Sequence, residues 1–155
     1  MALKLTINIA RKYNNELIPQ LDRTNYFKLG KAECMRGELF NFALALGYNR
    51  NYQTQAEGKE SFFRTENIGN DRYIYASVYF QKNLENKTDN IDEIVDDDLV
   101  FKNAEDYANT GFSIIKDFVG KYSEEDLLFE LIGDMDQMYE QYEKDKNSAS
   151  KDVMS

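Results

Sequence analysis

The scarcity of proline and glycine is the feature that most constrains the fold of this chain. Its 155 residues include one proline, Pro19, and eight glycines. These residue types most often end regular secondary structure, so a chain with few of them favours long helices over many short strands. We therefore predict a mainly α fold: a compact single-domain bundle of four to five helices over residues 1–146, followed by a disordered tail at 147–155.

The clearest helix in the sequence is predicted over residues 31–46. Apolar residues recur there at spacings of three and four, which places them on one helix face. They are Ala32, Met35, Leu39, Phe42, Ala43 and Leu46. Gly47 follows, and we expect it to end the helix as a left-handed C-cap. Cys34 lies in the same helix, where we expect a small core residue.

Two further helices are predicted in the second half of the chain. The same spacing runs over residues 99–119, where Ala104, Ala108 and Gly111 lie on one side and would let another helix approach closely. Residues 123–126, Ser-Glu-Glu-Asp, have the pattern of a helix start, and an apolar face follows to about residue 144. The short turn between them predicts that the two helices are antiparallel neighbours.

For the segments before residue 60, the predictions rest on the alternation of apolar and polar residues and on composition. Residues 3–9 alternate apolar and polar side chains, which predicts a short N-terminal strand that needs a distant partner. Residues 11–21 fit either a helix or a loop. Residues 48–59 have no periodicity and predict a long exposed loop.

Residues 71–82 fit either a strand or a helix. Their Tyr, Ile, Val and Phe favour a strand, whereas a capping residue at position 70 or 71 and the helical neighbours favour a helix. We favour the helix, with a face that contains Tyr73, Ile74, Ala76, Val78 and Phe80.

The residue types present exclude most enzyme chemistry. The chain has no histidine and one cysteine, so histidine-dependent metal sites, Ser-His-Asp and Cys-His systems and intrachain disulfides are excluded. No apolar run reaches the roughly 18 residues of a membrane span, and residues 1–10 lack the pattern of a signal peptide. We predict a cytoplasmic protein with no catalytic residue, no cofactor, no metal and no membrane association.

Two groups of carboxylates are candidates for a metal site. Residues 89–98 are rich in Asp and Glu, but a calcium loop that starts at Asp92 would place Asp97 where its glycine belongs. We interpret this group as an acidic helix start, capped by Thr88 or Asp89. Glu130 and Asp134 share a helix face, and nothing else in the sequence converges on them.

The net charge of −9 divides unequally along the chain. Residues 1–82 carry 12 Lys and Arg against 8 Asp and Glu, and residues 83–155 carry 7 against 20. The halves therefore have net charges of +4 and −13, and all six arginines lie in the first half. Either the two halves pack together and partly neutralise each other, which we favour, or the first half presents a basic surface to a partner.

Six residues are the candidate contacts for nucleic acid or a protein partner. Arginine suits phosphate and carboxylate groups, and tyrosine suits stacking and protein interfaces. The candidates are Arg36, Tyr48, Arg50, Tyr52, Lys59 and Arg64. The two tyrosines lie in the predicted loop, where they are expected to be least committed to packing.

Three stretches share their order and spacing with a known group of proteins: residues 36–48 (RGELFNFALALGY), 61–66 (SFFRTE) and 104–111 (AEDYANTG). They resemble small accessory proteins encoded beside bacterial DNA phosphorothioation (Dnd-type) and related phage-defence loci, which carry an F-A-x-x-L-G-Y helix and a later E-x-Y-A-x-x-G helix. The resemblance covers about residues 30–120. It brings no catalytic residue, and it implies an accessory role with protein partners in a defence complex that handles DNA.

The sequence leaves three functional hypotheses. The leading one is a non-catalytic accessory protein of a DNA-modification or phage-defence system, which acts through protein contacts and, in one version, contacts DNA through the basic candidates. The alternative is an acidic inhibitor of phage type, whose −13 half imitates nucleic acid and blocks a DNA-binding protein. A metal enzyme that uses only carboxylates ranks last. The oligomeric state is left open.

Overall fold

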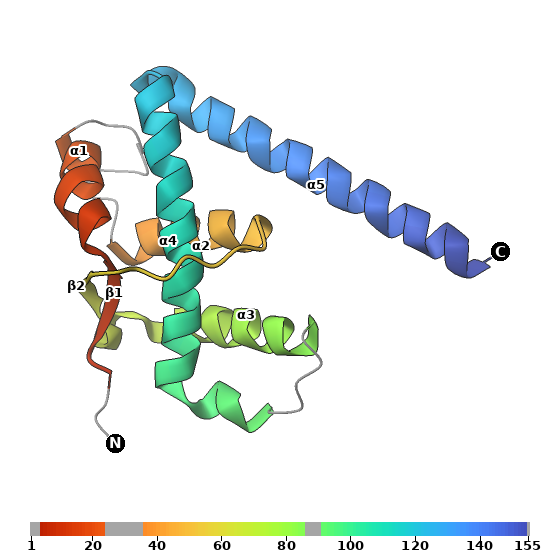
Figure 1. The fold of residues 1–155 in the computed structure, drawn as a ribbon, viewed down its shortest axis with the longest axis horizontal. Helices are drawn as coiled ribbons and strands as arrows, with labels where there is room; N and C mark the ends of the chain where they lie inside the picture. Colours follow the sequence, from red (N-terminus) through yellow and green to blue (C-terminus); the bar gives the residue numbers. More distant parts are fainter. Residues whose placement is uncertain (1–3, 24–35, 86–90, 155) are drawn as a thin grey trace.

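The computed structural model describes residues 4–23, 36–85 and 91–154 (Figure 1). The mainly α fold class and the short N-terminal strand are confirmed. Single helical turns lie at Tyr13–Leu17, Thr65–Asn67, Gly69–Asp71 and Ile91–Val95. The longer elements are β1 (Thr6–Ala10), α1 (Ile18–Arg23), α2 (Arg36–Asn49), β2 (Lys59–Arg64), α3 (Arg72–Glu85), α4 (Asp97–Lys121) and α5 (Glu124–Met154).

The partner of the N-terminal strand is β2, which the sequence did not predict. The strands are antiparallel, with Ile7 opposite Phe63 and Asn8 opposite Ser61. The register shifts between these two pairs, so Phe62 is the extra residue of a β-bulge. The bulge interrupts the alternation of faces, and the rings of Phe62 and Phe63 both join the core. An alternating apolar pattern is therefore missing from β2.

α4 is the centre of the fold, and α2 is its closest neighbour. Ten consecutive residues of α4, from Asn103 to Phe112, are buried, so the helix is covered on every side over nearly three turns. The two helices cross at glycines. A Cβ atom on Gly111 would lie 1.7 Å from the carbonyl oxygen of Ala43, and one on Gly47 would lie 1.8 Å from that of Tyr107.

The crossing confirms one prediction and corrects another. Gly111 permits the close helix contact that its small neighbours predicted. Gly47 is not a C-cap, because α2 continues through it to Asn49 and the glycine lies against α4. Residues 31–35 of the predicted helix, with Cys34, lie outside the described residues.

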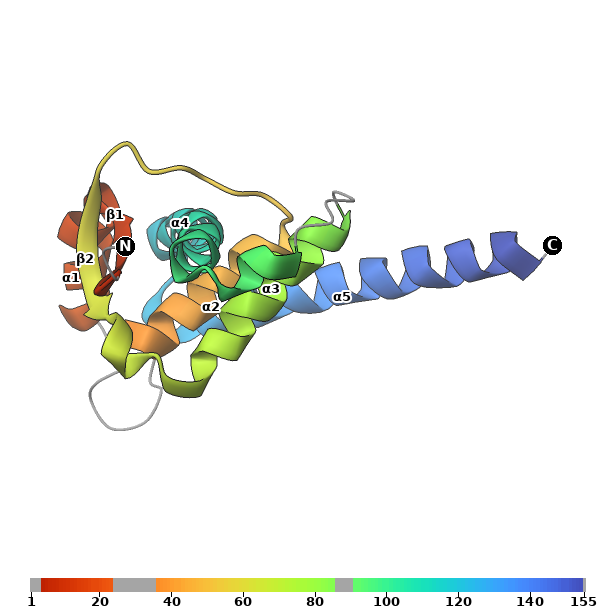
Figure 2. The ribbon, with the colours of Figure 1, turned by 90° about the horizontal axis from the view of Figure 1, so that it is seen from below.

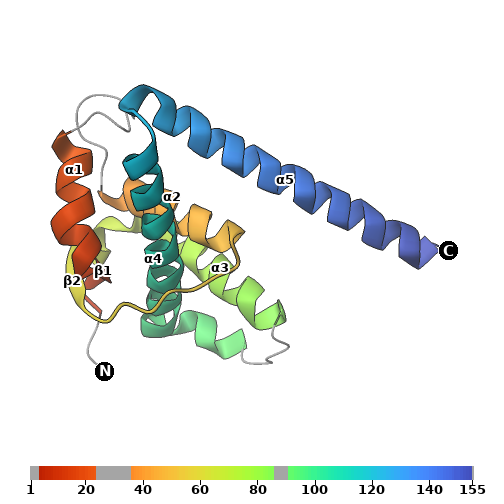
Figure 3. The ribbon, with the colours of Figure 1, turned by 45° about the horizontal axis from the view of Figure 1, so that its top comes forward.

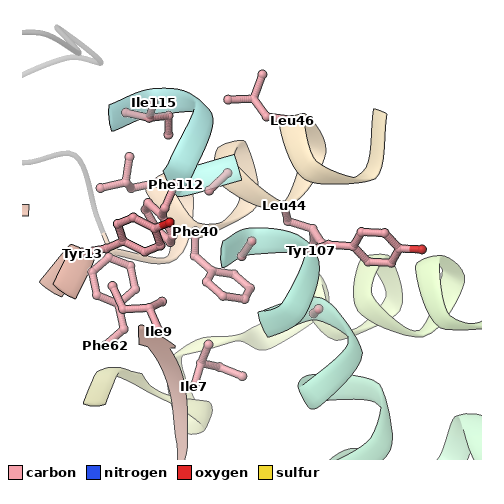
Figure 4. Close-up of a cluster of buried hydrophobic side chains, with 14 of the residues drawn as sticks. Ile7, Ile9, Tyr13, Phe40, Leu44, Leu46, Phe62, Tyr107, Phe112 and Ile115 are labelled. Carbon is pink, nitrogen blue, oxygen red and sulfur yellow. The ribbon is translucent and has the colours of Figure 1, made fainter. Parts of the chain in front are cut away.

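Apolar side chains of the strands, the N-terminal turn and α2 pack around α4. Phe62 meets Phe112 edge-on, with 5.8 Å between ring centroids, and Phe40 meets Tyr75 at 5.7 Å. Figure 4 shows this cluster, to which Ile7 and Ile9 of β1 also point. Burial of such side chains is worth about 1.5–3 kcal/mol each and is the main stabilising contribution.

α3 packs against α2 and α4 through Tyr75 and confirms the helical interpretation of residues 71–82. Its predicted face is wrong in part. Tyr75 and Tyr79 are buried, Ala76 and Val78 are half-buried, and Tyr73 and Ile74 are 71% and 48% exposed. Residues on one face of a helix are three or four positions apart, whereas most residues of the predicted face are two positions apart, as on one face of a strand.

α4 begins at a cap inside the acidic segment. The carboxylate of Asp96 accepts hydrogen bonds from the backbone N–H groups of Asp98 and Leu99, at 3.0 and 3.4 Å. An acidic helix start was predicted, although its cap lies at Asp96 and the predicted capping residues, Thr88 and Asp89, lie outside the described residues.

α5 starts as predicted and then departs from the predicted bundle. Ser123 caps it, with its hydroxyl 3.4 Å from the backbone nitrogen of Asp126. Only the first turns of α5 pack on the body, and the helix then projects away from α4 (Figures 1 and 3). The expectation of two antiparallel neighbours along their lengths is therefore wrong. α5 also continues to Met154, so the stretch predicted as a disordered tail is helical up to that residue.

Candidate functional site

The six predicted contact residues do not form one cluster. Arg36 is the first residue of α2 and Arg50 directly follows its last, so they lie about 21 Å apart at the rise of a helix. Lys59 and Arg64 are the two ends of β2, about 17 Å apart. Residues this far apart do not make a single basic patch, although the prediction that they contact a partner stays untested by their positions.

The four basic candidates are each paired with a carboxylate of this chain. Arg36 donates two hydrogen bonds to Asp22, at 2.9 and 2.7 Å. The other pairs are Arg50–Asp134 at 2.7 Å, Lys59–Glu105 at 3.2 Å and Arg64–Glu66 at 3.1 Å. A phosphate would have to compete with these carboxylates, which lowers the attraction for nucleic acid.

The two halves of the chain neutralise each other in part, as we favoured from the sequence. Five ion pairs among the described residues join residues 1–82 to residues 83–155. They are Lys4–Glu105, Lys59–Glu105, Arg50–Asp134, Arg72–Asp97 and Lys116–Glu16. These pairs account for part of the charge that is divided along the sequence, and most carboxylates of α5 are not among them.

The two candidate tyrosines differ in their surroundings. Tyr48 belongs to the last turn of α2 and packs edge-on against Tyr107, with 5.6 Å between ring centroids. Its prediction as a loop residue with little packing is wrong. Tyr52 lies in the loop and is 65% exposed.

The loop that holds Tyr52 is a strap across α4. Residues 50–58 leave α2, cross α4 on the side opposite α2 and enter β2 (Figure 2). The backbone N–H of Thr54 donates to the carbonyl oxygen of Asp106 at 2.9 Å, and the hydroxyls of Thr54 and Thr110 lie 2.8 Å apart. The amide of Gln53 donates to Asn103 at 2.7 Å. The predicted exposed loop is thus tied to a buried polar stripe.

Two more polar side chains of α4 form hydrogen bonds with the edge of β1 that does not pair with β2. The carboxylate of Glu105 accepts from the backbone N–H of Asn8 at 2.9 Å, and Asn109 accepts from that of Ala10 at 3.0 Å. Both side chains are fully buried. Glu105 also pairs with Lys4 at 2.7 Å and with Lys59. These contacts satisfy backbone groups that β2 does not reach, so they serve the fold.

A pocket of about 550 Å³ lies beside the strap. Its lining includes two cations, Arg11 and Lys12, and two carboxylates, Glu16 and Glu57. Opposite charges in equal number give it no strong preference for an anion or a cation. Arg11 is also paired with Glu60 at 3.1 Å, which lies outside this lining.

Two tyrosines of α3 have perturbed acidity. Burial, helped by the charge of Asp71, raises the pKa of Tyr75 well above its usual range. Burial also raises the pKa of Tyr79, with a further contribution from its hydrogen bond to Glu93. Both hydroxyls therefore stay protonated, and the Tyr75 hydroxyl donates to Asn41 at 2.7 Å. These are properties of packed structural groups.

Metal and membrane roles find no support in the parts of the chain that the structure describes. Within residues 4–23, 36–85 and 91–154, no three Cys, Asp or Glu side chains converge on a point where they could hold an ion. Asp134, half of the acidic pair noted on the last helix, is instead engaged by Arg50. No described helix combines the length and the apolar character that a membrane crossing requires.

The projecting part of α5 is the remaining candidate for a functional site. Leu127 and Leu131 are fully buried against the body, and Met135 is half-buried beside the core. From Asp136 to Ala149 every described side chain is exposed or half-buried. Figures 1 and 3 show this part of α5 extending beyond α2 and α3.

An apolar stripe runs along α5 from its packed start into the projecting part. Ile132, Tyr139 and Tyr142 are 49%, 65% and 61% exposed, and Met135 lies between them. Their spacing of three, four and three residues places all four on one face. We call these four residues the α5 stripe. The sequence predicted its periodicity, but it assigned the stripe to a packed bundle and to no candidate site.

Comparison with known proteins adds no relative: no protein-family model, no curated protein and no solved structure matches this chain.

Proposed function

We propose that this protein is a non-catalytic binding protein that acts through contacts with other proteins, and that α5 is its main contact element. The observation that carries the proposal is the α5 stripe, an apolar helix face that extends beyond the body of the protein. Helices that dock into a partner present anchors at spacings of three, four and seven residues, as this stripe does. Tyrosine is also among the residues that dominate protein interfaces.

The distribution of charge supports a protein partner over DNA. The basic residues proposed as contacts are each engaged by a carboxylate, and they are spread over α2 and β2. Nucleic-acid affinity depends on several cations that neutralise neighbouring phosphates. The stripe offers apolar area, which proteins recognise and the DNA backbone does not.

The setting that we propose is cytoplasmic, in a bacterial DNA-modification or phage-defence system. Its support is the resemblance of residues 36–48, 61–66 and 104–111 to accessory proteins of such loci. The lack of histidine and of a cysteine–histidine pair supports a role without catalysis.

Co-purification from the native host tests the proposal. The tagged full-length protein is compared with a double variant of the stripe, Tyr139→Ala with Tyr142→Ala, and with Tyr73→Ala. Tyr73 is a matched control because it lies on α3 and is 71% exposed. We expect at least one protein of a defence locus to be recovered with the parent and with Tyr73→Ala, and to be lost with the double variant.

Two results would contradict this proposal. One is recovery of the same partners by the double variant, which would show that α5 is not the contact element. The other is that no defence-locus protein is recovered and that deletion of the gene leaves phage sensitivity unchanged.

The acidic inhibitor is a second candidate function, and the many carboxylates of α5 favour it. Residues 124–143 contain eight carboxylates and no basic residue. Asp136 and Glu140 are exposed there. A gel-shift competition separates the two candidates: an inhibitor displaces DNA from a purified DNA-binding protein, added salt weakens the effect, and Asp136→Asn with Glu140→Gln reduces it.

A further inference from the structure

We propose that the α5 stripe is covered by α5 of a second copy of this chain, and that the two helices run antiparallel. This inference rests on the proposed function, because it takes the α5 stripe as the contact element: the stripe joins two copies of the chain, and a defence-locus protein binds the dimer. It assigns Ile132, Met135, Tyr139 and Tyr142 to a symmetric dimer interface.

The spacing of the stripe is that of a helix pair. Ile132, Met135, Tyr139 and Tyr142 follow the alternating steps of three and four residues that form the seam between paired helices. Lys146, four residues after Tyr142, takes the next position of this alternation, and Ala149 follows three residues later. The apolar part of the seam therefore runs from Ile132 to Tyr142, and the small Ala149 can face a larger side chain beyond it.

The exposed tyrosines of the stripe supply part of the area that a dimer interface needs. Covering a tyrosine removes roughly 150–250 Å² from water. Tyr139 and Tyr142 are 65% and 61% exposed. The four tyrosines of a dimer would therefore bury roughly 400–600 Å², a third to a half of the roughly 1,200 Å² at the lower limit of specific interfaces. Ile132, 49% exposed, and the half-buried Met135 add to this area.

The charge along α5 favours the antiparallel direction. Residues 124–143 carry eight carboxylates and no basic residue, whereas residues 144–154 carry three lysines and two carboxylates. A parallel pair would place the two acidic segments side by side, where like charges repel. An antiparallel pair places the lysine-containing end of each helix beside the acidic start of the other.

The shape of the protein favours the same direction. The body lies at the N-terminal end of α5, and the C-terminal end is far from it (Figure 1). An antiparallel pair keeps the two bodies at opposite ends of the helix pair. The buried Leu127 and Leu131 stay on their own body, and Leu131 borders the stripe, four residues before Met135.

The register follows if the two-fold axis passes between Tyr139 and Tyr142. Tyr139 of each copy then faces Tyr142 of the other, and Ile132 faces Ala149. In this arrangement the two copies of residue 149 are about 25 Å apart along the helix axis, because 17 residues separate positions 132 and 149. A parallel pair would place the two copies of residue 149 in contact.

Mass in solution tests the dimer. Sedimentation equilibrium of the purified full-length protein is expected to show a monomer–dimer equilibrium below about 100 µM. Tyr139→Ala with Tyr142→Ala is expected to raise the dimer Kd at least about 100-fold, since two aromatic anchors are lost from each copy. Tyr73→Ala should leave the Kd unchanged. Circular dichroism shows whether each variant retains its helices.

Disulfide trapping tests the direction. In a Cys34→Ser background, an oxidised mixture of Ile132→Cys and Ala149→Cys should form a cross-linked dimer, and Ala149→Cys alone should not. Efficient cross-linking of Ala149→Cys alone would establish a parallel pair and overturn the antiparallel arrangement. A monomer at about 100 µM, or a dimer that the stripe variant does not weaken, would overturn the second copy as the occupant.

The outcomes separate this inference from the proposed function. A monomeric protein whose stripe variant loses a defence-locus partner would contradict the dimer and leave the proposed function standing. A protein that dimerises through α5 and recovers no other protein would support the dimer and contradict the accessory role.

Discussion

α4 and α5 are consecutive long helices with apolar faces, and they have opposite surroundings. α4 is buried on all sides over residues 103–112, and even its polar side chains have partners inside the protein. α5 buries Leu127 and Leu131 at its start, and its later apolar side chains are exposed or half-buried. Periodicity shows that a helix has an apolar face, and it does not show which molecule covers that face.

Substitution of a glycine in α4 should have the largest effect on stability, and the same substitution in α5 should have a small effect of opposite sign. Gly111→Ala would place a Cβ atom 1.7 Å from the carbonyl oxygen of Ala43, a backbone atom that cannot move without separating α2 from α4. We expect a loss of stability of about 3 kcal/mol or more, or no folded protein. Thermal unfolding followed by circular dichroism measures it, and an unchanged melting temperature would contradict the helix crossing.

A substitution of Glu105 measures how much the buried polar contacts of α4 contribute to the stability of the protein. Glu105→Ala would leave the backbone N–H of Asn8 and the ammonium groups of Lys4 and Lys59 without their shared acceptor. We expect a loss of about 3–5 kcal/mol in urea unfolding, as for other broken buried ion pairs. The control is Glu60→Ala, whose carboxylate is one-third exposed beside Arg11 and should cost about 1 kcal/mol or less.

Tyr75 packs edge-on against Phe101 of α4. We expect it to make the stability of the protein depend on pH in the alkaline range. Its pKa is raised in the folded protein, so the folded state holds this proton more tightly than the unfolded state does. The resulting contribution is present below the ordinary tyrosine pKa of about 10 and is lost as the pH rises above it.

Tyr75→Phe should therefore flatten the fall in stability above a pH of about 10. It should also cost about 1 kcal/mol at neutral pH, because the hydrogen bond to Asn41 is lost. Urea unfolding at a series of pH values measures both effects. Tyr139→Phe, on exposed α5, is the control, and an equal effect from it would contradict this role of Tyr75.

Gly133 on α5 gives the smallest effect, with the opposite sign to Gly111. A Cβ atom on Gly133 would have no neighbour within 4 Å. Gly133→Ala should therefore gain about 0.5–1 kcal/mol of helix stability. Helix content by circular dichroism and amide exchange over α5 measure it, and destabilisation would show that α5 packs more closely there than the structure shows.

The helices could be predicted from sequence because their signals are local. Gly111 with Ala104 and Ala108 indicated a close helix contact, and Ser123 marked the start of α5. β2 could not be predicted, because the bulge at Phe62 removes its alternation and its partner lies more than 50 residues away. Gly47 was assigned to a cap because a glycine after an apolar run fits a helix end as well as a helix crossing.

The candidate site was harder to predict than the fold. Arg36, Arg50, Lys59 and Arg64 were chosen by residue type. The carboxylate partners of Arg50 and Lys59 come from distant segments that only the folded chain brings near, whereas the partner of Arg64 is two residues away. The sequence did not single out Glu105 and Asn109, because their partners are backbone N–H groups of β1. The α5 stripe was visible as a pattern, but its exposure depends on the direction in which α5 leaves the body.

The wrapping of the chain around α4 has a consequence for the order of folding. The N-terminal strand, α2 and the strap all depend on a helix that begins at Asp97, and Asn8 and Ala10 reach partners 97 and 99 residues further along. During synthesis the first 64 residues therefore emerge before the helix that they enclose exists. Contacts over such separations form late and slowly. The N-terminal half must wait with its apolar faces uncovered, so newly made chains should engage chaperones until α4 is complete.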